Sequence, residues 1–127
     1  MTLSRASNTA DLVNQLAEFD GVDGCALVEV DTGMAWHYAG SLPDIESISE
    51  AAAEFWRVQT RVSHRLLILG DLHSVAYSFS KRTVALFPCS KEPALVLVCV
   101  AAKLDVNWKA WSAKVLELRQ LLRSKQR

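Results

Sequence analysis

Three stretches of the chain repeat hydrophobic residues every three or four positions, which is the spacing of a helix with one apolar face. They are residues 9–19, a longer segment from Asp44 or Ser47 to Leu67, and residues 105–125. In the last stretch the repeat forms a narrow seam made of Trp108, Trp111, Val115, Leu118 and Leu122. The pattern therefore predicts three helices, preceded by a polar, flexible N-terminus over residues 1–8.

Strand-like patterns lie between these helices. Residues 25–30 and 34–39 are two short apolar runs joined by Asp31-Thr32-Gly33, whose residue types favour a hairpin turn. Residues 72–80 alternate between larger side chains and Ser or Ala, which is typical of a strand, and residues 83–87 return after a turn at Lys81-Arg82. Residues 89–93 are predicted to form a loop, and the unbroken apolar run 94–100 a central strand covered on both faces.

The order helix, two strands, helix, three strands, helix predicts an α/β (α+β) fold. A five-stranded, mostly antiparallel sheet with helices packed on its faces satisfies that order. A chain of 127 residues is one domain by default, so we expect a single domain over residues 9–127.

Composition narrows the possible partners. Lys plus Arg equals Asp plus Glu at 14 each, so no overall field attracts nucleic acid or an anionic membrane. The longest apolar run, residues 94–102, is far shorter than the ~20 residues of a transmembrane helix, and no signal peptide is visible. Three is an odd number of cysteines, and they lie in apolar, strand-like stretches, which argues against a disulfide framework. We therefore expect a protein of the reducing cytoplasm, without membrane insertion.

The long second helix is predicted to have two apolar faces. Ser47 and Glu50 have the spacing of a capping box at its start. The face expected to cover the sheet contains Ile48, Ala52, Phe55, Val62 and Leu66. A flanking strip, which we expect to form a docking surface for another helix, contains Ser49, Ala53, Trp56, Thr60, Ser63 and Leu67.

Patterns that carry catalysis or bind a cofactor are scarce. His37, His64 and His73 have no metal-ligand spacing, and no phosphate-binding glycine motif is present. Asp31-Thr32-Gly33 occurs once, without the second acidic partner that an aspartic protease needs. We therefore predict no catalytic residues, no metal and no cofactor.

A few residues keep alternatives open. Ser80-Lys81 and Ser90-Lys91 are adjacent pairs that point apart on a strand, which is poor geometry for a nucleophile. Cys25 and Cys99 are read as buried small hydrophobic residues, whereas Cys89 is the one candidate reactive thiol. The basic residues near the C-terminus are interpreted as a solvated helix face.

Several motifs resemble those of the roadblock/dynein light chain family. The likeness begins with Gly21-Val22-x-Gly24-x-x-Leu27-Val28-x-x-Asp31-x-Gly33, continues with Glu50-Ala51-Ala52-Ala53 and Leu69-Gly70-Asp71-Leu72, and spans residues 11–109. The sequence departs from the family pattern at Ser80-Lys81-Arg82, where a glycine is common, and at the Trp108 and Trp111 pair.

The resemblance implies a profilin-like fold and a homodimer. In such a dimer the third strand pairs with its twin, and the second helices pack across the two-fold axis. The positions that would then lie at the interface are Ser49, Trp56, Thr60, Ser63, Ser74, Ala76 and Ser78. Members of the family are non-catalytic scaffolds or regulators of small Ras-like GTPases and of motor or signalling complexes.

Two other functions stay open at this point. Profilin-like sheets also occur in small-ligand or signal-sensing modules, in which case Trp36, His37, Tyr77 and Trp111 would line a pocket. An enzyme that acts through Cys89 is the third hypothesis.

Overall fold

The computed structural model describes residues 4–102 and 106–125 of the chain. Its elements are α1 (Ser4–Ala17), β1 (Val22–Glu29), β2 (Ala35–Gly40), α2 (Ile45–Ser63), the 3-10 helix η1 (His64–Leu69), β3 (Val75–Ser78), β4 (Thr83–Lys91), β5 (Ala94–Ala101) and α3 (Trp108–Lys125). This order of helices and strands is the predicted one, with η1 as a short extension of α2.

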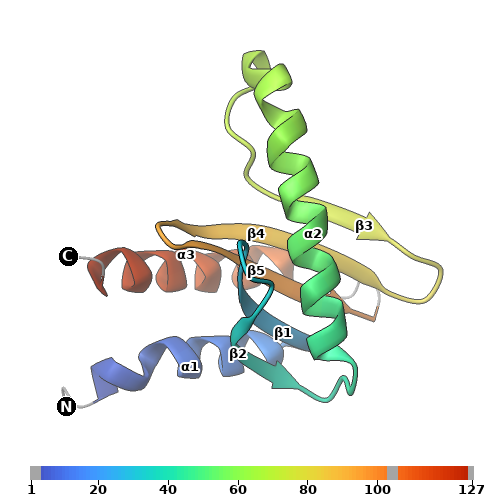
Figure 1. Cartoon of the computed structure of the whole chain (residues 1–127). Helices are drawn as coiled ribbons and strands as arrows, with labels where there is room; N and C mark the ends of the chain where they lie inside the picture. The colour runs from blue at the N-terminus through green and yellow to red at the C-terminus, as the bar shows by residue number, and fades with distance from the viewer. Residues whose placement is uncertain (1–3, 103–105, 126–127) are drawn as a thin grey trace.

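The five strands form one antiparallel sheet in the order β2-β1-β5-β4-β3. Helices α1 and α3 lie side by side on one face of this sheet, and α2 crosses the other face (Figure 1). Strand β5 lies in the middle and is buried from Leu95 to Ala101, which confirms the prediction from its unbroken apolar run. The predicted fold class is therefore confirmed.

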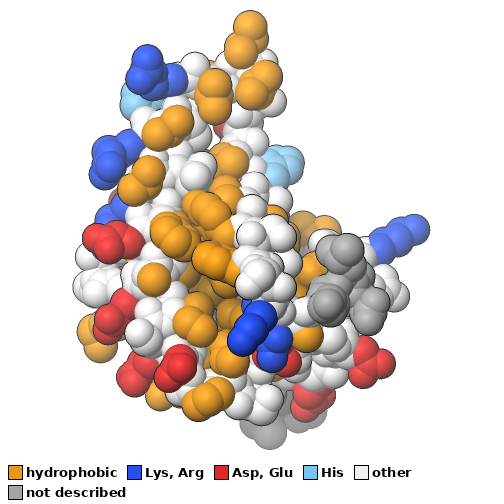
Figure 2. Space-filling model, turned by 90° about the vertical axis from the view of Figure 1, so that its right-hand side faces the viewer, with side chains coloured by type: hydrophobic (Ala, Val, Ile, Leu, Met, Phe, Trp, Pro, Cys, Tyr) orange, Lys and Arg blue, Asp and Glu red, His pale blue; other side chains and the backbone are white. Residues whose placement is uncertain are grey.

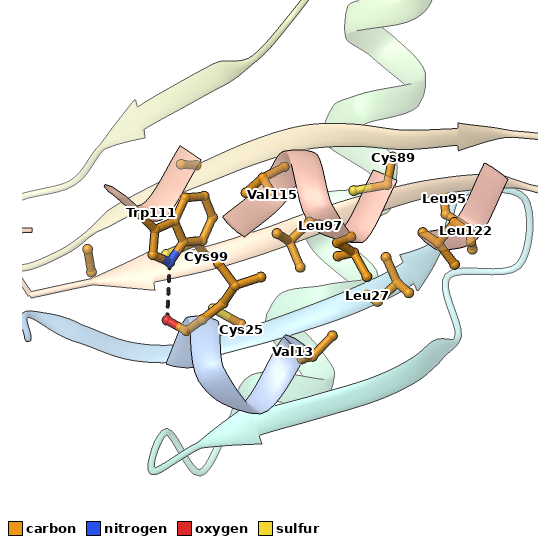
Figure 3. Packing of buried hydrophobic residues seen from close by; sticks show 14 of the residues in the cluster. Val13, Cys25, Leu27, Cys89, Leu95, Leu97, Cys99, Trp111, Val115 and Leu122 are labelled. Carbon is orange, nitrogen blue, oxygen red and sulfur yellow. Dashed lines mark hydrogen bonds between the residues drawn. The ribbon is translucent and has the colours of Figure 1, made fainter. Parts of the chain in front are cut away.

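The face covered by α1 and α3 holds the larger core. The seam of α3 packs into it, and Trp111, Val115, Leu118 and Leu122 are all buried (Figure 3). The indole Nε1 of Trp111 donates a hydrogen bond of 3.1 Å to the carbonyl oxygen of Leu16, which joins α3 to α1. The predicted seam of the last helix is confirmed, and its purpose is packing within the chain.

Two glycines in the β1–β2 hairpin have backbone angles that other residues rarely adopt. Gly33 ends the Asp31-Thr32-Gly33 turn with a φ of +77°, and its N–H donates to the carbonyl of Glu29 at 2.8 Å. Gly40 has a φ of +110°, and a Cβ there would lie 2.5 Å from the carbonyl oxygen of Asp23. Both glycines are therefore required by the backbone path of the hairpin.

Several predicted boundaries are wrong. Helix α1 begins at Ser4, so residues 4–8 belong to it, while residues 1–3 and Asp105 lie outside the described residues. Strand β3 covers only four of the nine residues expected. Cys89 lies in β4 rather than in a loop, beside a bulge between Pro88 and Ser90.

The start of α2 also differs from the prediction. The helix begins at Ile45, and Asp44 precedes it without a capping hydrogen bond from its side chain. Ser47 and Glu50 therefore lie inside the first turns of the helix and do not form the predicted capping box.

Candidate interaction surface

Helix α2 is longer than the part of the sheet that it covers. Its buried residues are confined to its first two-thirds and end at Trp56. Beyond that point α2 and η1 extend past the edge strand β3, and the chain returns to β3 through a loop (Figure 1). Within the described residues, the last third of the helix therefore has no sheet of its own chain beneath it.

The inner face of α2 is made of small residues and one tryptophan. The buried residues are Ile45, Ser49, Ala52, Ala53 and Trp56. Ser49 is 1% exposed, and its hydroxyl donates to the carbonyl of Ile45 at 2.7 Å. The predicted assignment of faces is wrong for Ser49, Ala53 and Trp56, which face the sheet beside Ala52. The small volumes of Ser49, Ala52 and Ala53 let the helix approach a layer of valines.

An apolar stripe remains exposed on the other side of α2 and η1. We call it the α2 stripe: its residues follow at steps of three and four and are Phe55, Val58, Val62, Leu66 and Leu69. Their exposed fractions range from 38% for Phe55 to 77% for Leu69. Helical steps of three and four place Phe55, Val58 and Val62 on one face of α2, as in a helix-packing seam. Leu66 and Leu69 continue the exposed apolar surface in η1, where the backbone angles of Leu66 are not helical.

The stripe ends in an apolar tip, the four consecutive residues Leu66–Leu69. Leu67 is 65% and Ile68 is 94% exposed. In the space-filling view hydrophobic side chains continue from the top of the molecule down its middle (Figure 2). Contiguous exposed apolar surface of this kind marks an interaction site in a folded protein.

An apolar hollow of about 310 Å³ lies beside the first half of α2. Its lining includes Leu42, Ile48, Ala51, Phe55, Phe79 and Val84, with Arg82 as the charged member. Arg82 Nε lies 2.5 Å from Asp23 Oδ2, so this charge is already paired. The hollow and the α2 stripe share Phe55, which makes them one continuous surface.

Strand β3 is the edge of the sheet next to this surface. It pairs with β4 on one side only, so its other side is unpaired within the described part of the chain. Tyr77 lies under α2, where its ring centroid is 4.5 Å from that of Phe55 and its hydroxyl accepts a 3.0 Å hydrogen bond from Gln59 Nε2. Ala76 and Ser78 are exposed, so small side chains border an open edge.

The seven residues expected at a dimer interface thus fall into two groups. Ser49 and Trp56 are buried against the sheet of their own chain, and their place in an interface stays a prediction. Thr60, Ser63, Ser74, Ala76 and Ser78 are exposed or half-buried around the open edge, and their place in an interface stays a prediction.

The sequence pattern does not identify the whole of this exposed surface. Neither of the two strips predicted for the second helix contains Val58 or Ile68, although both belong to the apolar surface of α2 and η1. The signal that points to them is the run Leu66–Leu69, since four consecutive large apolar residues cannot all face one core from a single helix.

The alternative pocket does not form as expected. Trp111 is fully buried on the face of α1 and α3, whereas Tyr77 packs on the opposite face with α2. Trp36 is 44% exposed on the edge strand β2, where its indole N–H donates to Glu29 at 3.2 Å. These residues therefore do not line one cavity, and the prediction of this pocket is wrong.

Candidate catalytic groups are isolated or chemically quiet. Cys89 is 8% exposed, and burial raises the pKa of its thiol to about 12, although the Arg119 guanidinium acts in the opposite direction. Cys25 and Cys99 oppose each other on β1 and β5, and the hydrogen bond that the Cys99 thiol makes to Cys25, together with burial, raises the pKa of Cys99. Residues 4–102 and 106–125 contain no cluster of three or more His, Cys, Asp or Glu that fits a metal.

No helix within the described ranges is both long enough and apolar enough to span a bilayer.

Solved structures of low sequence identity share this architecture. A Roadblock/LC7 domain from Streptomyces avermitilis matches with a TM-score of 0.76 at 14% identity, over 92% of this chain and 96% of that one. MglB from Myxococcus xanthus matches with a TM-score of 0.73 at 13% identity, over 91% of this chain and 85% of that one. A structure described as MglB with a tetrameric arrangement gives 0.75 at 11% identity, over 95% and 92% of the two chains.

No protein-family model and no curated protein matches the sequence itself. The structural likeness agrees with the resemblance seen in the glycine motif of β1 and the Ala-rich start of α2. The chain therefore has the roadblock/LC7 fold.

Proposed function

We propose that this protein is a non-catalytic homodimeric scaffold that regulates a small Ras-like GTPase or another component of a signalling complex. The observation that carries the proposal is the α2 stripe, whose residues beyond Phe55 extend past the edge strand β3 and stay exposed within the described part of the chain. The inference about GTPases comes from the resemblance to the roadblock family, and the shared fold with MglB supports it.

The geometry of one protomer favours a two-fold partner. An open antiparallel edge accepts a second strand through backbone hydrogen bonds, and an identical β3 offers the same small side chains. A two-fold axis beside β3 continues the sheet into the second copy. The last third of α2, which extends past β3, then lies over the sheet of the second copy. That sheet covers the apolar residues that the first copy leaves exposed.

The same operation brings the two stripes together. Because a two-fold interface uses the same patch on both subunits, each α2 stripe meets the other stripe and the apolar hollow beside it. Burying an exposed Val, Leu or Phe side chain contributes roughly 1.5–3 kcal/mol when burial is complete. The residues of the stripe are already partly buried, so each contributes a fraction of this amount, and the sum over both subunits opposes the cost of association.

The dimer is tested by measuring mass in solution with light scattering over a concentration series. We expect the unmodified protein to have twice the mass of one chain and Leu66→Glu to be a monomer, because the substitution places a charge within the stripe. Leu116→Glu is a matched control, since Leu116 is 53% exposed on α3 and Leu66 is 48% exposed. A monomeric unmodified protein, or equal loss of mass in both variants, contradicts the proposal.

The regulatory function is tested by titration against the small GTPase most closely associated with the protein in its source. We expect binding in at least one nucleotide state, lost in Leu66→Glu and kept in Leu116→Glu. Hydrolysis of GTP is measured in parallel, with and without the scaffold. Absence of binding in both nucleotide states together with an unchanged hydrolysis rate overturns this part, while the dimer measurement stands independently.

A further inference from the structure

A second surface lies on the opposite face of the sheet from α2. We call it the cationic groove, a hollow of about 490 Å³ between the end of α3, the end of β4 and the loop before β3. In Figure 1 the turn between β4 and β5 lies near the C-terminal part of α3. The groove is thus built by three segments that are far apart in the sequence.

Basic side chains from all three segments line this groove. Lys91 comes from the end of β4, Arg119 and Arg123 from α3, and His73 from the loop after η1. Asp71 is the one carboxylate among the lining residues, against three permanent cations. Cys89 also lines the groove but adds no negative charge at neutral pH, because burial raises the pKa of its thiol to about 12.

Within the described residues, the three cations of the groove lack the ion pairs that some other cations of the chain form. Arg57, Arg82 and Lys114 each lie within ion-pair distance of a carboxylate. Within the part of the chain that the structure describes, no ion pair involves Lys91 or the two arginines of the groove. Arg119 and Arg123 are four residues apart on one helix, a spacing at which like charges repel.

Arg119 is held in place by the protein. Its Nε donates a 2.8 Å hydrogen bond to the carbonyl oxygen of Pro88, next to the bulge of β4. A guanidinium carries five N–H donors, so the bonds of Arg119 to the Pro88 carbonyl and to the Cys89 side chain leave further donors for an anion. A fixed arginine loses little conformational entropy when it binds an anion, which favours recognition of a phosphate by two parallel hydrogen bonds.

The chain continues this positive character beyond the groove. From Leu118 to the last residue the sequence contains Arg119, Arg123, Lys125 and Arg127 and no acidic residue. The total charge of the chain is nevertheless zero. Cations are therefore concentrated in this part of the sequence.

We propose that the cationic groove binds a phosphate-bearing anion with more than one negative charge. Three cations from different segments match a polyphosphate or a multiply phosphorylated headgroup better than a single carboxylate, because each added phosphate charge gains another partner. The groove also exceeds the size of one phosphate group. It lies on the face of α1 and α3, so binding there is compatible with a partner on the α2 stripe.

The probe for this site is inorganic tripolyphosphate, titrated by calorimetry at constant ionic strength. We expect saturable binding that weakens at least tenfold in Lys91→Gln and in Arg123→Gln. Lys109→Gln is the matched control, because Lys109 is an exposed cation at the opposite end of the same helix. Thermal unfolding of each variant verifies that the fold is intact.

A second arm identifies the source of the phosphate. Vesicles of phosphatidylcholine with and without a phosphorylated phosphatidylinositol are pelleted with the same variants. Retention that requires the phosphorylated lipid and is lost in Arg123→Gln assigns a lipid headgroup, whereas tripolyphosphate binding alone assigns a soluble ligand. Absence of saturable binding in both arms, or an equal loss in Lys109→Gln, overturns the proposal.

Discussion

The two faces of the sheet use an apolar helix in different ways. On one face the seam of α3 is buried along its whole length, from Trp111 to Leu122, by α1 and the sheet. On the other face α2 buries one strip and leaves a second strip exposed. An amphipathic pattern therefore indicates that a helix has an apolar face. The length of the helix relative to the sheet determines how much of that face the sheet of the same chain covers.

The closed face is expected to carry most of the stability of the protomer. Trp111→Ala removes a fully buried indole and its hydrogen bond to Leu16, so we expect the free energy of unfolding to fall by about 3–5 kcal/mol. Chemical denaturation measures this loss. Trp36→Ala is the comparison on the exposed edge strand, and an equal loss in the two variants would remove the distinction between closed and open regions.

The open face is expected to matter for association alone. Ile68→Asp combined with Leu69→Asp adds two charges to the tip, where the side chains are 94% and 77% exposed. We expect the dimer to dissociate at about 100-fold higher concentration, a change of ~2.7 kcal/mol. Sedimentation equilibrium measures the constant. If dissociated protomers of this variant also unfold much more easily than the unmodified chain at equal dilution, the tip supports the monomer and the comparison fails.

Gly40, which lies against the backbone of β1, and Gly70, which lies in open space, allow the same comparison for the backbone. Gly40→Ala places a Cβ 2.5 Å from the Asp23 carbonyl at a φ of +110°, and we expect a loss of about 1–3 kcal/mol. Gly70→Ala at the end of η1 meets no atom within 4 Å, so only the strain of its φ of +98° applies. Urea denaturation of both variants should rank Gly40→Ala as the more destabilised, and the reverse order would contradict the geometry.

The smallest effect is expected at Cys89. With a pKa of about 12, its thiolate fraction at pH 8 is about one in ten thousand, so alkylation by iodoacetamide should be far slower than for free cysteine. Because the pKa is raised in the folded state, the associated stability is present below the ordinary thiol pKa and is lost as the pH rises toward 12. Cys89→Ala should flatten that alkaline slope; rapid labelling at pH 8 would show an open thiol instead.

The sequence predicted the parts of the fold in which a single pattern has a single explanation. The apolar run of β5 and the narrow seam of α3 each fit one environment, and both predictions are confirmed. Helix α2 carries two neighbouring strips that satisfy the same periodicity. Hydrophobicity favoured Phe55, Val62 and Leu66 as the inner face, but the smaller residues Ser49 and Ala53 pack closer to the valine-rich sheet.

The candidate site was predicted less completely for the same reason. The exposed residues at the edge strand followed from the alternation of small side chains, and Ser74, Ala76 and Ser78 do lie exposed. The cationic groove did not follow from the sequence, because its members come from β4, α3 and a loop that only the fold brings together. The total charge of the chain is balanced, and the fold gathers the three cations of the groove from β4 and α3.

The overhang of α2 also bears on the fate of newly made chains. A single protomer exposes four consecutive large aliphatic residues, Leu66–Leu69, in η1. Exposed apolar segments of this kind are recognised by chaperones and proteases. If two chains pair as proposed, pairing covers this segment, and we expect the lifetime of the chain to rise with the local abundance of identical chains. The amount of the protein would then determine how long it persists as well as what it binds.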